Sequence, residues 1–273
     1  MSLFICPVCG SPLVCSGESY RCKNNHSFDL SAQGYVNLLP ANQKNSKLPG
    51  DDKSMVTARA AFLKKEYYGA LLAELETLAT GCTNSSPNVL DSGCGEGYYT
   101  EGIYEALYNS GKAPTVYGID ISKSAVRLAS KRCHSCAFAV ASAFHLPICS
   151  DSIDLLLNCF SPLCLSEFTR VLKGGGYFLY VVPAPEHLWE LKKVLYDIPY
   201  KNELEKTPYN GYEYCKINRV EDVISLRCKE DIQNLFAMTP YFWKTPKAGR
   251  ARLEALDELK THISFDVHVY RKL

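Results

Sequence analysis

Two kinds of hydrophobic pattern alternate along most of this chain. Short apolar runs bounded by glycine or polar turns indicate buried strands, and the segments between them repeat apolar residues at helical spacing, as Tyr99 and Ile103 do. Strands that alternate with helices predict a parallel sheet covered by helices on both faces. The expected strands cover residues 115–120, 137–142, 152–160 and 174–183, and a later alternating run covers 261–270 after a predicted helix at 250–260.

A glycine-rich turn follows the first strand of this pattern, in the stretch PNVLDSGCGEGYYT at residues 87–100. The order strand, glycine turn, helix is the opening unit of a doubly wound sheet, and such sheets bind ligands at the carboxyl ends of their strands. Glycines let the backbone approach a ligand closely. The three glycines are Gly93, Gly95 and Gly97.

The spacing of this turn differs from the usual dinucleotide pattern G-x-G-x-x-G. Asp91 stands two residues before the first glycine, where a carboxylate would repel a pyrophosphate but hold a cationic or amino-bearing ligand. Asp120 ends the strand TVYGID and is placed to accept hydrogen bonds from ribose hydroxyls. The ribose contact alone does not separate NAD from S-adenosylmethionine.

A cluster of thiols and one imidazole lies near the N-terminus. Cys6-x2-Cys9 and Cys22-x3-His26 have the ligand number and spacing of a closed structural zinc site. The alternative is a chance grouping in a cysteine-rich chain, but the first 35 or so residues hold too few large hydrophobes to fold unaided. Cys15 lies between the pairs without a partner of its own.

The composition is that of an ordinary soluble protein, with 47% hydrophobic and 22% charged residues and a net charge of +1. We find no apolar run near the length of about 20 residues that a membrane helix needs, and no signal-peptide pattern. We therefore expect a cytoplasmic protein without a membrane partner. Its thirteen cysteines are then interpreted as zinc ligands and buried free thiols rather than disulfides.

The segment from Pro40 to Glu66 is rich in basic residues. Two interpretations stay open for it, a solvated linker or an arm that contacts phosphates. The charged residues are Lys44, Lys47, Lys53, Arg59, Lys64 and Lys65, against Asp51, Asp52 and Glu66.

A family resemblance adds to these patterns. VLDSGCGEGYYT and YGIDISKSAV resemble motifs I and II of the class I S-adenosylmethionine-dependent methyltransferases. With the zinc cluster in front, the chain resembles the 23S rRNA guanine-N1 methyltransferases of the RlmA type. The other matching stretches are SFDLSAQGYVNLLP, PGDDKSMVTARAAFL, FHLP, FSP, PEHLWELK and MTPYFWK.

The resemblance implies a Rossmann-like α/β fold with a seven-stranded, mostly parallel sheet and a small N-terminal zinc ribbon or knuckle. It implies a zinc-binding RNA-recognition module at 1–36, a basic linker and helix at 37–66, and a methyltransferase domain at 67–273. A substrate-side insertion is expected around 184–250. The chain has many aromatic residues there, but their contacts are open.

The resemblance also implies where S-adenosylmethionine binds. Asp91, Gly93 and Gly95 would flank its methionine part and Asp120 its ribose, and Ser142 with Ala143 would lie at its adenine. Many class I enzymes carry Asp where this chain has Ser142. The expected set is completed by Gly97, Tyr99 and Ile121.

The target atom is expected at the end of the fourth strand, in NCFSP at residues 158–162. Phe160 is expected either to stack on a base or to lie in the core, and Asn158 could bond the guanine edge. Guanine N1 carries a proton at neutral pH, so a general base would uncover its lone pair. The candidates are Glu186 and His187, although Glu186 is also suited to the first turn of a helix.

The expected partner is a hairpin loop of 23S rRNA. One wall of an RNA cleft would consist of Tyr20, Arg21, Lys23 and Phe28 of the zinc module together with the Lys-rich stretch after Leu39. Two alternatives remain, a small-molecule methyltransferase and a non-catalytic RNA-binding factor. A homodimer stays open.

Overall fold

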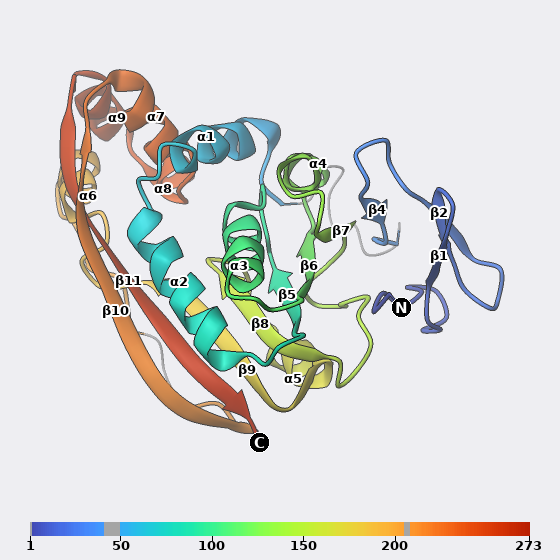
Figure 1. Cartoon of the computed structure of the whole chain (residues 1–273). Helices are drawn as coiled ribbons and strands as arrows, with labels where there is room; N and C mark the ends of the chain where they lie inside the picture. The colour runs from blue at the N-terminus through green and yellow to red at the C-terminus, as the bar shows by residue number, and fades with distance from the viewer. Residues whose placement is uncertain (1, 41–49, 205–207) are drawn as a thin grey trace.

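The fold is described from a computed structural model, which covers residues 2–40, 50–204 and 208–273. A mixed sheet forms its centre (Figure 1). Its strand order is β10-β11-β9-β8-β5-β6-β7-β4, which is eight strands within the described residues. The strands are β4 Val36–Asn37, β5 Asn88–Ser92, β6 Thr115–Asp120, β7 Ala137–Val140, β8 Ile153–Cys159, β9 Leu172–Pro183, β10 Tyr212–Leu226 and β11 Leu259–Lys272.

The helices surround this sheet and partly cover its ends (Figure 1). They are α1 Lys53–Leu63, α2 Gly69–Cys82, α3 Tyr98–Asn109, α4 Lys123–Arg132, α5 Leu165–Val171, α6 Trp189–Leu195, α7 Lys229–Ala237, α8 Tyr241–Lys244 and α9 Lys247–Glu254. None of these helices has the length and apolar character needed to span a bilayer, as far as the described residues go.

The predicted doubly wound fold is confirmed in the middle of the sheet. The strands β4, β7, β6, β5, β8 and β9 pair in parallel, and β5 at the centre is buried from Val89 to Ser92. Burial on both faces explains why the apolar residues Val89 and Leu90 follow each other directly instead of alternating with polar residues. The order of the chain through the sheet reverses between β5 and β8, and ligands bind at the carboxyl ends of strands at such positions.

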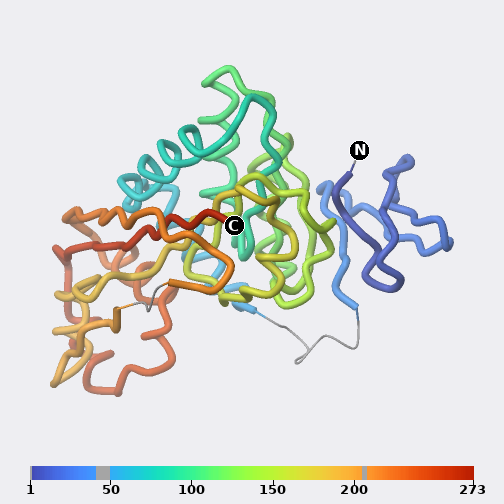
Figure 2. The backbone as a smooth tube through the Cα atoms, turned by 90° about the horizontal axis from the view of Figure 1, so that it is seen from below, coloured from blue at the N-terminus to red at the C-terminus, as the bar shows by residue number. Residues whose placement is uncertain are grey.

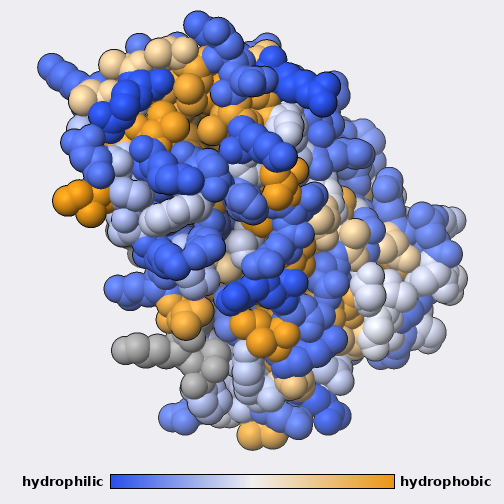
Figure 3. Space-filling model, turned by 90° about the vertical axis from the view of Figure 1, so that its left-hand side faces the viewer, coloured by the Kyte–Doolittle hydropathy of each residue, from blue (hydrophilic) through white to orange (hydrophobic). Residues whose placement is uncertain are grey.

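The antiparallel edge of the sheet differs from the sequence expectation. β10 pairs with β11 along its whole length and belongs to the sheet, although it lies inside the predicted insertion at 184–250. The predicted helix at 250–260 ends at Glu254, and β11 already begins at Leu259. β10 exposes charged side chains such as Lys216 and Glu221, which discourage pairing with another sheet edge. Figure 3 shows this mostly hydrophilic side, with apolar side chains gathered near the top.

The N-terminal module is joined to the opposite edge of the sheet (Figures 1 and 2). It contains a small antiparallel sheet of β1 Val14–Ser16, β2 Ser19–Arg21 and β3 Ser27–Asp29. The chain then enters the main sheet as β4, where Val36 pairs with Ala139 of β7. This short strand raises the count from the seven expected strands to eight.

Phe4 anchors the module from its other side. Its side chain is 1% exposed and packs edge-on against Tyr117, with ring centroids 5.1 Å apart. The neighbouring backbone pairs with the loop before β8, since Ile5 N–H donates to Pro147 O at 2.9 Å and Cys149 N–H donates to Leu3 O at 2.9 Å. The module and the main sheet thus share one hydrophobic cluster.

Candidate active site and metal centre

The predicted zinc ligands come together in the N-terminal module. The potential ligand atoms of Cys6, Cys9, Cys22 and His26 lie within 4.8 Å of one another. His26 Nδ1 is 3.5 Å from Cys6 Sγ and 3.4 Å from Cys22 Sγ, and Cys9 Sγ is 3.7 Å from Cys22 Sγ. Two segments present them, the turn after Phe4 and the turn between β2 and β3.

These distances fit a tetrahedral zinc ion. With zinc–sulfur bonds of about 2.3 Å and zinc–nitrogen bonds of about 2.0 Å, neighbouring ligand atoms of a tetrahedron lie about 3.5–3.8 Å apart. Hydrogen bonding from Ser11 lowers the pKa of the Cys9 thiol to about 5, which favours the thiolate that a metal binds. Cys15 is exposed on β1 and outside the cluster, as predicted. The four ligands leave no open position, so the metal would be structural.

A cavity of about 1120 Å³ lies at the carboxyl ends of the parallel strands. Its lining residues come from the carboxyl ends of β5, β6, β7, β8 and β9 and the segments that follow them, and from α1 and α8. Of the predicted cofactor set, the following line it: Asp91, Gly93, Gly95, Tyr99, Asp120, Ile121, Ser142 and Ala143.

Gly97 of the predicted cofactor set is not among the residues that line the cavity. It is the N-cap of α3, with a φ of 85°, and a side chain there would lie 2.9 Å from Ala129 of α4. Gly97 therefore allows two helices to pack closely. Gly93 also has a positive φ, and a side chain there would overlap Ser161, so the glycine turn lies directly against the end of β8.

Two buried carboxylates beside the glycine turn have unpaired oxygen atoms. Asp91 Oδ1 and Glu96 Oε1 have no hydrogen-bond partner among the described residues, and both side chains line the cavity. Burial raises the pKa of Asp91 to about 7, although Thr100 Oγ1 donates a 2.6 Å hydrogen bond to its other oxygen. Burial also raises the pKa of Glu96. These atoms suit the ammonium and sulfonium charges of S-adenosylmethionine.

Asp120 is held rigidly at the end of β6. Its Oδ1 accepts a 2.7 Å hydrogen bond from Ser122 N–H, and its Oδ2 accepts a 3.0 Å bond from Gly95 N–H. The carboxylate thereby links the second strand to the glycine turn. Each oxygen has remaining acceptor capacity for a ribose hydroxyl.

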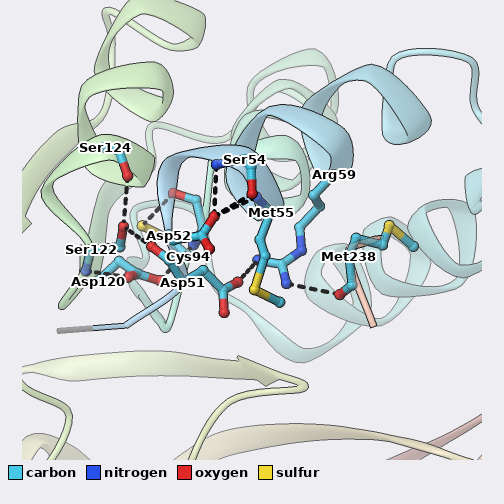
Figure 4. A network of polar contacts seen from close by, with 11 residues as sticks. Asp51, Asp52, Ser54, Met55, Arg59, Cys94, Asp120, Ser122, Ser124 and Met238 are labelled. Carbon is cyan, nitrogen blue, oxygen red and sulfur yellow. Dashed lines mark hydrogen bonds and ion pairs between the residues drawn. The ribbon is translucent and has the colours of Figure 1, made fainter. Parts of the chain in front are cut away.

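Residues 50–63 form part of the basic segment from Pro40 to Glu66, and several of them line this cavity. Figure 4 shows how this part of the chain is held. Asp52 caps α1 by accepting hydrogen bonds from Ser54 N–H and Met55 N–H at 2.7 and 2.9 Å. Ser122 Oγ donates to Asp51 O at 2.9 Å, which ties the segment to the start of α4. Lys44 and Lys47 lie outside the described residues.

Arg59 is one of the cavity residues that sequence reasoning missed. Its guanidinium lies 2.5 Å from Asp51, and it also donates to Met238 O at 3.3 Å (Figure 4). A side chain at Gly95 would lie 3.9 Å from the guanidinium, so the positive charge sits next to the glycine turn. Asp51 and the other nearby acids raise the pKa of Arg59 despite burial. Arg59 lies in the stretch PGDDKSMVTARAAFL, and the family resemblance of this stretch was the signal in the sequence that could have identified it.

Two predicted residues at the end of β8 have different positions. Phe160 lines the cavity, is 45% exposed and has a φ of 55°, an uncommon conformation for a bulky residue. Asn158 is fully buried and its amide donates to Ser92 O, Ser161 Oγ and Pro162 O at 3.0–3.3 Å. Asn158 thus shapes the turn that presents Phe160, and it is absent from the cavity lining.

The two predicted bases, Glu186 and His187, lie in different surroundings. His187 is buried at the cavity wall, where its Nδ1 accepts a 3.2 Å hydrogen bond from Ser264 N–H. Burial lowers the pKa of His187 to about 3. Glu186 is 61% exposed, forms a 2.5 Å ion pair with Lys201 and does not line the cavity. The neighbouring side chains point to opposite sides, so Glu186 lacks the geometry of a general base.

The residues predicted to form one wall of an RNA cleft do not line the cavity. Arg21 and Lys23 are exposed on the module, whereas Tyr20 and Phe28 are partly buried against its hydrophobic cluster. Within the described part of the chain, the cavity is lined by residues from Gly50 onward and by none of the module. The wall would lie beside the cavity rather than inside it.

Two family models match the chain, "RlmA, N-terminal" at residues 4–47 and "Methyltransferase domain" at 83–236. The chain is also 33% identical to the Bacillus subtilis (strain 168) protein YxjB, provisionally described as a 23S rRNA (guanine-N(1)-)-methyltransferase. That match covers 98% of this chain and 96% of the relative. The chain belongs to the RlmA family. It is an S-adenosylmethionine-dependent methyltransferase with a Cys3His zinc-ribbon site.

Other similarities agree with this membership. The RlmA-family chain is 36% identical to the 23S rRNA (guanine(748)-N(1))-methyltransferase of Streptomyces fradiae, over 70% of this chain and 66% of the relative. Among solved structures, the YcgJ protein of Bacillus subtilis superposes with a TM-score of 0.53 at 17% identity. It covers 73% of this chain and 98% of its own length, and the similarity shows the methyltransferase fold.

Proposed function

We propose that this protein transfers a methyl group from S-adenosylmethionine to N1 of a guanine in a hairpin loop of 23S rRNA. The observation that carries the proposal is the form of the cavity. Its lining combines two groups of residues: the glycine turn with its acids and Arg59, here called the cofactor side, and the aromatic rings of Phe144, Phe160 and Trp243, here called the aromatic side. A donor and a planar base can therefore meet in one enclosed space.

The cofactor side assigns roles to the chain's own residues. The paired acids Asp91 and Glu96 receive the positive charges of the methionine part, and Arg59 receives its carboxylate in place of Asp51. Asp120 binds the ribose hydroxyls. Ser142, which is nearly buried, and Ala143 lie at the adenine. The bound cofactor supplies an electrophilic methyl group on sulfur.

The aromatic side is suited to a base that has left its helix. A base in folded RNA must be unstacked before its N1 can be reached. Phe144, Phe160 and Trp243 are 52%, 45% and 64% exposed and line the same cavity from the loop after β7, the end of β8 and α8. Exposed aromatic rings stack on bases with about 1–3 kcal/mol per base. These rings would replace the stacking that the flipped guanine loses.

The zinc module would recognise the part of the RNA that contains the target guanine. Arg21 and Lys23 are exposed there, and the module sits at the β7 edge, next to the loop that carries Ser142 and Ala143. Loops of RNA are read by shape, stacking and phosphate contacts. Methylation of ribosomal RNA would place the protein in the cytoplasm.

The proposal is tested by incubating the purified chain with methyl-labelled S-adenosylmethionine and 23S rRNA from cells that lack the protein. We expect label in the rRNA and an arrest of reverse transcription at one guanine, because an N1 methyl group blocks Watson–Crick pairing. Transcripts of single hairpins then test the loop assignment. Label in a metabolite fraction with none in the rRNA would favour the small-molecule alternative and overturn the proposal.

A further inference from the structure

Two buried polar side chains form part of the wall of the cavity. Tyr68, at the N-cap of α2, is 4% exposed, and His187, after β9, is 6% exposed. Their Oη and Nε2 atoms are 3.5 Å apart, and both residues line the cavity. Phe265 packs against both rings, at 4.9 Å from Tyr68 and 4.5 Å from His187, so the pair is held in place.

The hydrogen-bond pattern fixes which atom carries the proton. Ser264 N–H donates to the lone pair of His187 Nδ1, so Nδ1 carries no proton and the ring is neutral. The proton of a neutral imidazole then lies on Nε2. The Nε2–H group therefore faces the hydroxyl oxygen of Tyr68 as a donor. The Tyr68 hydroxyl can then donate its own hydrogen into the cavity. His187 in this form is a donor and not a base.

A donor at this wall matches the chemistry of the proposed reaction. When N1 of guanine loses its proton, the negative charge spreads onto the neighbouring carbonyl oxygen O6. A fixed donor at O6 stabilises that charge as it develops. In the overall step the N1–H bond breaks and its proton goes to water, the N1 lone pair forms the bond to the methyl carbon, and the carbon–sulfur bond breaks with its electron pair on sulfur.

We propose that the Tyr68 hydroxyl donates a hydrogen bond to O6 of the target guanine and that His187 is the positioning residue which orients this hydroxyl. The inference rests on the proposed function and adds a means of removing the N1 proton without a carboxylate base. The charged and titratable groups that face the pair are Arg59 of α1, Lys192 of α6, Tyr99 of α3 and Tyr241 of α8. Tyr99 Oη has no hydrogen-bond partner among the described residues.

The direct test combines one hydroxyl deletion with one atom change in the substrate. Tyr68→Phe removes the donor, and the matched control Tyr67→Phe removes a hydroxyl that instead donates to Asp231 at 2.7 Å. The RNA hairpin carries either guanine or 6-thioguanine at the target, since sulfur is the weaker acceptor. S-adenosylmethionine binding is measured by calorimetry for each variant.

We expect Tyr68→Phe to lower kcat roughly 100-fold with unchanged cofactor affinity, and Tyr67→Phe to stay within about twofold of the wild type. The wild type should prefer guanine to 6-thioguanine, and Tyr68→Phe should lose that preference. Equal activity of Tyr68→Phe and wild type, or an unchanged preference, would overturn the inference. A wild type that leaves every guanine unmodified would instead overturn the proposed function.

His187 has an independent test that does not depend on the folding of Tyr68→Phe. His187→Gln keeps a donor near Nε2 and should recover most of the activity that His187→Phe loses, because the orienting contact returns. The wild-type rate should also continue to rise between about pH 7 and 9 as the N1 proton becomes easier to remove. A plateau above the ordinary pKa of histidine, abolished in His187→Gln, would show a base and contradict the inference.

Discussion

The guanidinium of Arg59 lies 2.5 Å from the carboxylate of Asp51, at the place where α1 lies over the glycine turn. The pair joins two residues of one short segment, yet it borders a cavity built from strands far along the chain. An arginine held beside a ligand site by a single carboxylate can exchange that partner for a carboxylate of the ligand. The segment at 50–63 therefore lines the cavity in which we propose that the cofactor binds.

This relationship predicts the effect of removing the guanidinium. Arg59→Ala should weaken S-adenosylmethionine binding roughly ten- to a hundredfold, because a charge-assisted hydrogen bond contributes about 1.5–3 kcal/mol. Isothermal titration calorimetry measures this change in affinity for S-adenosylmethionine. Arg252→Ala, which removes an arginine paired with the exposed Asp197, is the control and should bind as the wild type does. Equal binding by Arg59→Ala would remove this arginine from the cofactor site.

Asp91 predicts a pH dependence of cofactor binding. Its pKa is about 7 in the ligand-free protein, and a bound cation lowers it, so binding releases a proton below that pH. Affinity for S-adenosylmethionine should rise from about pH 5.5 to 7 and then level off. Asp91→Asn should bind more weakly and without this rise, which titrations at several pH values would show.

The same carboxylate should destabilise the ligand-free fold. A raised folded-state pKa means that burial opposes ionisation, so the loss of stability grows as pH rises from about 4 to 7. Asp91→Asn should therefore unfold at a higher temperature than the wild type at neutral pH, while binding cofactor less tightly. A variant that is both less stable and unaltered in binding would contradict the role of Asp91.

Local sequence patterns identified the sites of this protein whose functional residues lie close together in the chain. The zinc ligands depend on two short turns, and the glycine turn and Asp120 depend on two adjacent strand–helix units. Arg59 was missed because its role arises from the docking of α1, which no local pattern encodes. Glu186 and His187 are neighbours in sequence, and only the packing of His187 against Phe265 shows which side chain enters the cavity.

The two edges of the sheet were also not predictable from local sequence patterns. β10 exposes most of its length, so its alternation of apolar and polar residues is weak, and its pairing with β11 decides its conformation. β4 is two residues long and exists because Val36 meets β7. The helix predicted at 250–260 stops early because residues from Leu259 onward join the long strand β11.

The zinc site predicts a separation between RNA modification and cofactor binding. Cys22→Ser should lose the metal and with it most of the folding energy of the module, since zinc contributes about 10–16 kcal/mol to such folds. Methylation of rRNA should be abolished while cofactor affinity survives. Cys15→Ser is the control and should retain zinc and activity, because Cys15 lies outside the cluster. An equal collapse of cofactor affinity in Cys22→Ser would reduce the module to a folding element.

Phe160 predicts an effect confined to the RNA. Phe160→Ala should raise KM for the rRNA hairpin about tenfold through lost stacking and leave cofactor binding unchanged. Tyr108→Ala, which removes an exposed aromatic ring on α3 away from the cavity lining, is the control. Filter binding of the hairpin and calorimetry of the cofactor separate the two effects. Loss of cofactor affinity with unchanged RNA binding would contradict a stacking role.

The most direct measurement is mass spectrometry of nucleosides and fragments from 23S rRNA of cells with and without this protein. The account predicts that N1-methylguanosine at one hairpin guanine disappears with the protein and returns when wild type is restored, but not with Cys22→Ser. An identical set of methylated guanines in both kinds of cell would contradict it.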